Sequence, residues 1–212
     1  MTKAFIFDLD GTLVDSELIA AETLAALLPE LGMTGDHIAR HYRGWRFATI
    51  LETFSRLTGR VLDDAFIATY RSLSARRYEN ELKAYPGVHE MLESLDRPMA
   101  IASSGPPEKI ARSLAITGLQ RFFPAHTYSA YTLNSWKPDP DLFLHAAKAL
   151  RVSPAEVLVV EDSDVGLEAA RRAGMRAILH NPENHPVAHG PHFSDYREFH
   201  RTVAALGALP QS

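Results

Sequence analysis

Two hydrophobic patterns divide the chain. Short, unbroken apolar runs, typical of strands buried on both faces of a sheet, occur at residues 4–7, 99–102, 157–160 and 177–179. Between about residues 16 and 82, apolar residues instead recur at helical spacing, with breaks at Pro29, Gly32 and Gly59. This middle stretch therefore predicts a small helical module without strands.

Helices alternate with the later strands. Helical spacing is found at residues 108–114, 141–150 and 165–173. This alternation predicts an α/β fold, a Rossmann-like parallel sheet covered by helices on both faces. Because right-handed crossovers put the carboxyl ends of parallel strands on one edge, a ligand should bind at that edge. The helical stretch is then an inserted all-helical cap domain at residues 16–83, within a discontinuous core at 1–15 and 84–212.

Composition narrows the range of partners and compartments. The 212 residues are 46% hydrophobic and 23% charged, carry a formal net charge of −4 and contain no cysteine. We therefore expect no nucleic-acid or membrane partner, which would need clustered Lys and Arg, and no disulfide or thiolate chemistry. No apolar stretch approaches the roughly 18 residues of a membrane span, and the amino-terminal run stops at Asp8, too early for a signal peptide. We expect a cytoplasmic protein, either a monomer or a weak homo-oligomer.

Four polar clusters should face the ligand-binding edge. They are Asp8 with Asp10, Ser103 with Ser104, Lys137 beside Trp136, and Glu161 with Asp162. Four converging carboxylates repel one another unless a divalent cation that prefers oxygen ligands, such as Mg²⁺, lies among them. Such a cation, a lysine and a hydroxyl together suit a phosphoryl group, which a fixed carboxylate can attack as a nucleophile.

Four sequence motifs also carry a family resemblance. Residues 5–16 read FIFDLDGTLVDS, residues 101–105 IASSG, residues 137–143 KPDPDLF, and residues 159–175 VVEDSDVGLEAARRAGM. In this order the segments resemble the four motifs of the haloacid dehalogenase-like hydrolases, in the helical-cap branch of β-phosphoglucomutase-like proteins. Four motifs in order are far more specific than one, and the resemblance covers nearly the whole chain.

The resemblance implies a role for each of the polar residues. Asp8 would be the nucleophile that becomes an aspartyl phosphate, and Asp10 would protonate the leaving oxygen and then activate water. Ser103 and Lys137 would hold the phosphoryl oxygens. Ser104 either contacts the substrate or serves the geometry of the turn.

Magnesium is the cofactor that the resemblance implies. Its ligands would be the Asp8 carboxylate, the backbone carbonyl of Asp10, and Asp162, with Glu161 in support. Taken alone, the residues around Asp10 could form only a turn, and Asp162 with Ser163 could form only a helix N-cap. Their place in the motifs favours a metal site.

Single residues separate the related activities. The dehalogenases lack the second aspartate, which is present as Asp10, and phosphonate-cleaving relatives use a cap lysine, whereas no lysine lies between Lys3 and Lys83. The β-phosphoglucomutases carry a histidine where Ala20 stands. We therefore expect a phosphatase, with a phosphomutase as the alternative. A non-enzymatic phospho-aspartate signalling domain combines similar residues, but its acceptor aspartate follows a middle strand and it has no use for a helical lid.

The expected substrate is a small phosphorylated metabolite, a sugar or sugar-acid phosphate. Residues 103–107, 129–140 and 181–187 resemble most the bacterial 6-phosphogluconate phosphatases of this superfamily. The carboxylate of such a substrate needs a cation, and the predicted cap contains Arg40, Arg43, Arg46, Arg76 and Arg77. Arg43 and Arg46 are the candidates for substrate binding, because they flank Gly44 in the kind of cap loop with which relatives recognise substrates.

Histidines crowd one proline-rich stretch near the carboxyl terminus. They are His180, His185, His189 and His192. Their spacing fits neither a helical pair nor a zinc finger, so we expect solvated or hydrogen-bonded loop residues rather than zinc ligands.

Overall fold

A parallel β-sheet forms the centre of the molecule in the computed structural model, which describes residues 1–187 and 190–207. The described part of the sheet has six strands in the order β3-β2-β1-β4-β5-β6, and every neighbouring pair is parallel. The strands are β1 (Ala4–Phe7), β2 (Met99–Ser103), β3 (Thr127–Ser129), β4 (Val157–Glu161), β5 (Arg176–His180) and β6 (His192–Phe193). The expected Rossmann-like α/β fold is confirmed.

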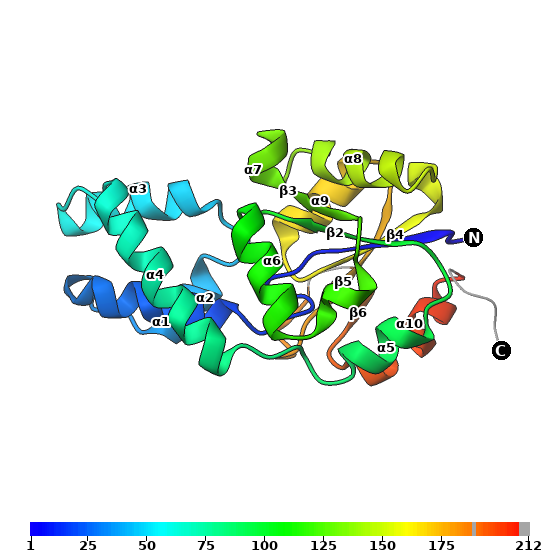
Figure 1. Cartoon of the computed structure of the whole chain (residues 1–212), viewed down its shortest axis with the longest axis horizontal. Coiled ribbons are helices and arrows are strands. Elements are labelled where there is room, and N and C mark those ends of the chain that lie inside the picture. The colour runs from blue at the N-terminus through cyan, green and yellow to red at the C-terminus, as the bar shows by residue number, and fades with distance from the viewer. Residues whose placement is uncertain (188–189, 208–212) are drawn as a thin grey trace.

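Each face of the sheet has its own hydrophobic core. Phe5 and Phe7 of β1 point to one core and Ala4 and Ile6 to the other, because successive side chains of a strand alternate between the faces. The Phe5 face is covered by α5 (Val88–Ser94), α6 (Pro107–Ile116) and α10 (Phe199–Ala205). The Ile6 face is covered by α8 (Asp141–Ala149) and α9 (Asp164–Arg172). Figure 1 shows the two layers of helices on opposite sides of the sheet.

The strand order places a crevice at the carboxyl ends of β1 and β4. From β1 the chain moves outward to β2 and β3, and it then returns to the other side of β1 for β4, β5 and β6. Neighbouring strands whose connections run in opposite directions leave a crevice beyond their carboxyl ends, where ligands bind in open α/β sheets. Asp8 directly follows β1, and Glu161 is the last residue of β4.

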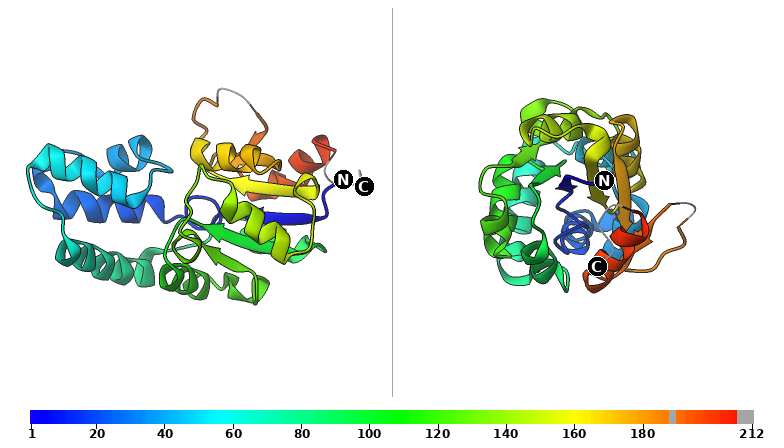
Figure 2. Two further views of the ribbon diagram at one scale, coloured as in Figure 1. Left: turned by 90° about the horizontal axis from the view of Figure 1, so that it is seen from above. Right: turned by 90° about the vertical axis from the view of Figure 1, so that its right-hand side faces the viewer.

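The inserted helices form a separate layer beyond this edge. They are α1 (Glu17–Leu27), α2 (Gly35–His41), α3 (Phe47–Thr58) and α4 (Asp64–Glu81). They pack around a hydrophobic cluster of their own, with Leu28 and Phe54 fully buried. Figures 1 and 2 show them as a group that extends away from the sheet. The two linkers to the core run side by side, with an antiparallel bridge between Val14 and Ala84.

Most predicted elements are confirmed, and the missed ones are short. The Asp63 side chain caps α4, since it accepts a hydrogen bond of 3.0 Å from the Phe66 N–H. The strands β3 and β6 span only three and two residues, too few for an alternation to be recognised. The helices α2, α5, α7 (Ala130–Leu133) and α10 were missed for the same reason, since none exceeds seven residues.

Short 3₁₀ turns complete the description. They are η1 (Pro29–Leu31), η2 (Leu119–Phe122), η3 (Pro154–Glu156) and η4 (Tyr196–Glu198). Among the described residues, no helix is both long enough and apolar enough to cross a membrane. The domain boundaries at residues 15/16 and 83/84 stay a prediction, and the bridge between Val14 and Ala84 lies beside them.

Candidate active site

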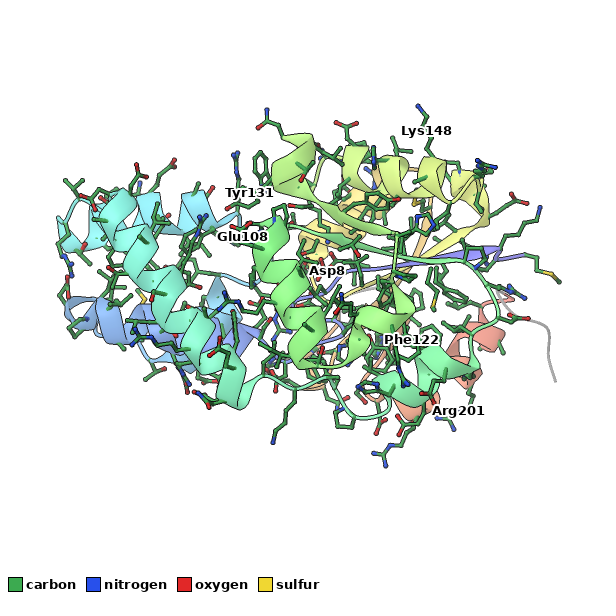
Figure 3. The ribbon with its side chains drawn as sticks, viewed as in Figure 1. Asp8, Glu108, Phe122, Tyr131, Lys148 and Arg201 are labelled. Atoms are coloured by element: carbon green, nitrogen blue, oxygen red, sulfur yellow. The ribbon has the colours of Figure 1, made fainter. Side chains whose placement is uncertain are left out.

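A cleft of about 560 Å³ separates the cap helices from the carboxyl edge of the sheet. All the predicted core residues line it, namely Asp8, Asp10, Ser103, Ser104, Lys137, Glu161 and Asp162. From the cap, Arg46 lines the cleft and Arg43 does not. Figure 3 shows Asp8 on the side of the core that faces the cap, with Glu108 and Tyr131 of the cleft wall, whereas Lys148 and Arg201 lie on the outside.

Lys137 joins the two strands at the centre of the site. Its Nζ atom lies 2.5 Å from Oδ1 of Asp8 and 2.5 Å from Oε1 of Glu161, and all three side chains are nearly buried. Burial raises the pKa of Asp8 to about 7, with Glu161 adding to the shift and Lys137 opposing it. Burial also opposes the charge of Lys137, but the two carboxylates raise its pKa above the usual value. The lysine therefore holds a positive charge beside the Asp8 carboxylate.

Glu161 is fixed by its own loop. Its Oε2 atom accepts hydrogen bonds of 2.9 Å from the Asp162 N–H, the Ser163 N–H and the Ser163 hydroxyl. A Cβ atom at Gly166 would lie only 1.9 Å from Cδ of Glu161. Glycine at position 166 therefore makes room for this carboxylate, which has both oxygens engaged.

Asp10 is held through a single oxygen. Oδ1 accepts a hydrogen bond of 2.6 Å from the Ser16 hydroxyl and lies 2.8 Å from Nζ of Lys109. Burial works to raise the pKa of Asp10, but Lys109 and the hydrogen bonds from Lys109 and Ser16 hold it below its ordinary value. Ser16 is the N-cap residue of α1, yet its hydroxyl makes no cap bond because it is used on Asp10.

Lys109 is the clearest residue that the sequence analysis missed. It follows the second motif by a few residues and lies in the first turn of α6. One signal was present: a helix N-terminus carries partial positive charge and disfavours a lysine there, unless an anion pairs with it. Asp10 is that anion.

Asp162 is a buried carboxylate with few donors. It accepts a hydrogen bond of 3.3 Å from the Thr12 hydroxyl, and Nε of Arg43 lies 3.9 Å away. Burial, and then the charges of Glu161 and Asp8, raise its pKa well above the ordinary value. Gly11, with φ of +77°, provides the space, because a Cβ atom there would lie 2.3 Å from Oδ2 of Asp162.

The two serines of the second motif differ in burial. Ser103 is 1% exposed, and its hydroxyl accepts a hydrogen bond of 3.0 Å from the Gly105 N–H. Ser104 is exposed and lines the cleft. The loop is held from the other side by the Ser129 hydroxyl, which donates to the Gly105 carbonyl at 2.6 Å.

The loop after β1 is anchored from the carboxyl-terminal part of the chain. His180 is 1% exposed and donates from Nδ1 to the Gly11 carbonyl at 3.0 Å, and Tyr196 donates to the Thr12 carbonyl at 2.9 Å. Burial lowers the pKa of His180 to about 4, so the imidazole is neutral.

The other described histidines of the proline-rich stretch, His185 and His192, contact their own loop instead of the loop after β1. His185 pairs with Glu183, and Nδ1 of His192 lies 3.3 Å from the Gly190 carbonyl. His189 lies outside the described residues.

The five cap arginines separate into two groups. Arg40 pairs with Asp36 on the surface, and Arg77 pairs with Glu22 and Glu81. Arg43 lies between Asp162 and Glu183, whose Oε1 is 3.3 Å from Nη2. Arg46 and Arg76 line the cleft, together with Arg71 and Arg112, which the sequence analysis did not single out.

Arg46 meets an aromatic wall of the core. Its guanidinium carbon lies 3.8 Å from the centroid of the Trp136 ring, and Tyr131 packs edge-on against the same tryptophan at 5.4 Å. Trp45, next to Arg46 in the chain, is 46% exposed and lines the cleft. The mouth of the cleft is therefore cationic and aromatic, whereas its base is acidic.

These features define a class of site. Two aspartates at the end of a central parallel strand, a buried lysine, a hydroxyl and two further carboxylates face one shielded cleft. Carboxylates so placed can serve as a nucleophile and as a general acid or base, while the lysine offsets the charge of an anionic substrate. This is the site of a hydrolase that acts on small anionic substrates.

Comparison with known proteins agrees with that class. The family model described as "Hydrolase: haloacid dehalogenase-like hydrolase" matches residues 2–174. The chain belongs to the haloacid dehalogenase-like hydrolases, and its enzyme class, predicted as phosphatase, is confirmed by this family and by phosphatases among its relatives.

Several relatives match over most of their length. The 6-phosphogluconate phosphatase of Escherichia coli is 33% identical over 192 residues, which cover 88% of this chain and 87% of that protein. The phosphoglycolate phosphatase of Aquifex aeolicus is 31% identical over 187 residues, 84% of each. A haloacid dehalogenase-like protein from Agrobacterium tumefaciens has a similar structure, with a TM-score of 0.86, 32% identity, and coverage of 98% of this chain and 100% of that one.

Proposed function

We propose that this protein is a magnesium-dependent phosphatase that hydrolyses a small phosphorylated metabolite through an aspartyl phosphate on Asp8. The observation that carries the proposal is the pairing of Asp8 with the buried Lys137 at 2.5 Å, at the base of a cleft that Asp10 also lines. A carboxylate held beside a fixed cation can approach the phosphorus of a dianionic ester, which it would otherwise repel.

The two aspartates differ in their surroundings, as two different roles require. Asp8 lies against Lys137 and would attack phosphorus, while the charge of Lys137, with the Ser103 hydroxyl, would neutralise and hold the phosphoryl oxygens. Asp10 would give a proton to the leaving oxygen and take one from water in the second step. Ser104 lines the cleft beside Ser103 and is proposed to contact the substrate.

The residues present fit a magnesium ion. Asp162 is a buried oxygen donor whose pKa is raised by burial and by the neighbouring carboxylates Glu161 and Asp8, and Nε of Arg43 lies 3.9 Å away. Within residues 1–187 and 190–207, no three acidic or histidine side chains form a ready-made metal cluster. We propose Asp8, the Asp10 carbonyl and Asp162 as ligands, with Glu161 holding the loop; the bound ion would neutralise phosphoryl oxygens.

A sugar or sugar-acid phosphate is the proposed substrate class. The arginines Arg46, Arg71, Arg76 and Arg112 line the cleft, and they offer partners for an anionic or polyhydroxylated leaving group. Two relatives, in Escherichia coli, are named 6-phosphogluconate phosphatase and fructose-1-phosphate phosphatase. Among such esters we propose 6-phosphogluconate, whose carboxylate would pair with Arg46.

A phosphomutase is the second candidate function, and one residue of the cleft disfavours it. Ala20 lines the cleft where the β-phosphoglucomutases carry a histidine, and a methyl group cannot exchange a proton with a sugar hydroxyl. A phospho-aspartate signalling domain needs no cap, whereas the cap residues of this protein supply one wall of the cleft. The cytoplasmic location and the monomeric or weakly associating state stay predictions of the sequence.

A substrate panel tests the proposal. Phosphate release is measured from 6-phosphogluconate, hexose phosphates, phosphoglycolate and p-nitrophenyl phosphate, with Mg²⁺ and with chelator. We expect multiple turnovers with Mg²⁺, loss of activity with chelator, and a higher Mg²⁺ requirement for Asp162→Ala than for Glu161→Ala. Full activity in chelator would show that the reaction needs no metal ion. Isomerisation of the substrate without phosphate release would favour the phosphomutase. A stable phosphoprotein without turnover would favour the signalling domain.

A further inference from the structure

Lys109 is a charged cleft residue that none of the four motifs contains. Its Nζ atom lies 2.8 Å from Oδ1 of Asp10, and the lysine and aspartate side chains are 28% and 15% exposed. The pair connects α6 to the loop after β1, two elements far apart in the sequence. We propose that Lys109 is a positioning residue, which holds Asp10 so that its second oxygen, Oδ2, exchanges the proton with the substrate and with water.

The hydrogen bonds of Asp10 distinguish its two oxygens. Oδ1 is occupied by the Ser16 hydroxyl at 2.6 Å and by Lys109 at 2.8 Å, and no hydrogen bond from the described part of the chain reaches Oδ2. An oxygen that receives two donors, one of them cationic, keeps the negative charge of the carboxylate. Whenever Asp10 carries a proton, that proton therefore lies on Oδ2.

The space beside Gly105 shows where Oδ2 lies. A Cβ atom at Gly105 would be 3.3 Å from Oγ of Ser103, 3.6 Å from Oδ2 of Asp10 and 3.6 Å from Cδ of Lys109. The free carboxylate oxygen and the proposed phosphoryl-binding hydroxyl thus border the same small gap, and the stem of Lys109 forms its third side. Gly105 itself lines the cleft.

The position of Lys109 has no local explanation. It is the third residue of α6, where the partial positive charge of the helix N-terminus disfavours a cation. From the cap, Tyr78 of α4 confines it, with the ring centroid 5.6 Å from Nζ. The ion pair with Asp10 offsets the unfavourable placement of a lysine in the first turn of α6.

The proposed step rests on the aspartyl-phosphate function above. As the Asp8 oxygen bonds to phosphorus and the ester P–O bond breaks, Oδ2–H of Asp10 gives its proton to the leaving oxygen. Water then attacks phosphorus, Oδ2 takes a proton from that water, and the bond between Asp8 and phosphorus breaks to release inorganic phosphate. Lys109 makes no bond in either half; it keeps Oδ1 in place, and misplacing a catalytic group by about 1 Å can cost about 100-fold in rate.

The test compares Lys109→Met with Lys109→Arg and with Lys148→Met, a matched control on the exposed side of α8 (Figure 3). With a sugar phosphate, whose leaving oxygen also needs the proton, we expect Lys109→Met to lower kcat by roughly 10- to 100-fold, with KM unchanged within about twofold. Lys109→Arg should recover most of the loss. Lys148→Met should behave as wild type.

Burst kinetics separate positioning from a structural defect. With p-nitrophenyl phosphate, whose leaving group needs no proton, Lys109→Met should release about one equivalent of nitrophenolate quickly and then turn over slowly, because the phosphoenzyme accumulates. A rise in KM at unchanged kcat would make Lys109 a substrate ligand and overturn the proposal, as would unchanged kinetics or a uniform loss without a burst. If the wild type released no phosphate, or Asp8→Asn remained active, the proposed function itself would fail instead.

Discussion

The two walls of the cleft are built differently. On the core wall, Lys137, Asp8 and Glu161 have side chains between 1% and 8% exposed, and their contacts are short and reciprocal. On the cap wall, Arg46 and Trp45 are exposed, and Arg46 touches the core through the face of an aromatic ring. Removing Lys137 would leave the buried Asp8 carboxylate without its cation, whereas a cap residue can change at little structural cost.

This difference assigns the chemistry to one wall and the choice of substrate to the other. The core groups follow strand ends whose positions are set by sheet hydrogen bonds, so their spacing is fixed before a substrate arrives. The cap side chains extend from helices and a loop, and they surround the part of the cleft that the leaving group would occupy. Mutations on the two walls should therefore differ in kind as well as in size.

The largest effect is expected at Asp8. Asp8→Asn keeps the size of the side chain but removes the nucleophile, so kcat should fall by about 10⁴-fold or more for every substrate. Stability should be unchanged or higher, because a buried carboxylate is replaced and Lys137 keeps Glu161 as its partner. Steady-state kinetics and thermal unfolding check the two parts. A variant with a tenth of wild-type activity would remove Asp8 from its role.

Gly166 is the next most sensitive point of the core wall. Within a helix, Gly→Ala ordinarily adds up to about 1 kcal/mol of stability, but Gly166 is the third residue of α9, and a Cβ there would lie 1.9 Å from Cδ of Glu161. We expect Gly166→Ala to lose about 3 kcal/mol or more, together with activity. The control is Gly174→Ala just beyond the same helix, with φ of +71° and nothing within 4 Å, which should lose about 1 kcal/mol and stay active.

Denaturant titrations of both glycine variants provide the measurement. The steric account of the Glu161 loop would be contradicted if Gly166→Ala were as stable and as active as the wild type.

Acid should destabilise the fold at His180, which anchors the loop after β1 through the Gly11 carbonyl. The pKa of His180 is about 4 in the folded protein, because of burial, and about 6.5 in an unfolded chain. Between these values the unfolded chain binds the extra proton, so the contribution of His180 to stability is complete above pH 6.5 and is lost as the pH falls toward 4. The full loss is about 3 kcal/mol.

The pH effect is isolated by comparison with a variant. The free energy of unfolding is measured at pH 5 and pH 7 for the wild type and for His180→Gln, and the wild type should lose more on acidification. Equal losses in the two proteins would show that His180 is not the group responsible.

The smallest effect, and the one confined to the cap wall, is expected at Arg46. Arg46→Ala should lower kcat/KM for 6-phosphogluconate by about 30-fold, which corresponds to the roughly 2 kcal/mol of a lost charged hydrogen bond. The kcat/KM for p-nitrophenyl phosphate should stay nearly unchanged. Arg40→Ala, whose partner is Asp36 outside the cleft, is the control. Arg43→Ala should affect both substrates alike, because Arg43 approaches Asp162 instead of the cleft. An unchanged substrate ratio for Arg46→Ala would remove the sugar-acid assignment.

The sequence predicted the core wall better than the cap wall, for a physical reason. Asp8, Ser103 and Glu161 stand at or next to the ends of apolar runs, and a parallel sheet brings such ends together whatever the rest of the chain does. Which way a long cap side chain turns depends on tertiary contacts. Arg43 and Arg46 flank the same glycine, yet only Arg46 lines the cleft.

The contacts of Asp10 could not be predicted from the sequence, because they also depend on tertiary structure. Ser16 is recognisable as a helix cap, and only the folded loop shows that its hydroxyl serves Asp10 instead. Lys109 reaches Asp10 because β2 and α6 are placed beside β1, a relation that local patterns do not contain.

The central claim is a covalent phosphate on Asp8, and direct detection of that bond tests it best. Asp10→Asn should still be phosphorylated by p-nitrophenyl phosphate with Mg²⁺ but should hydrolyse the intermediate slowly. After an acid quench, mass spectrometry of peptides should find one phosphoryl group on Asp8, and none in Asp8→Asn. Phosphate release that continues without any phosphorylated Asp8, or a phosphoryl group on another residue, would contradict the account.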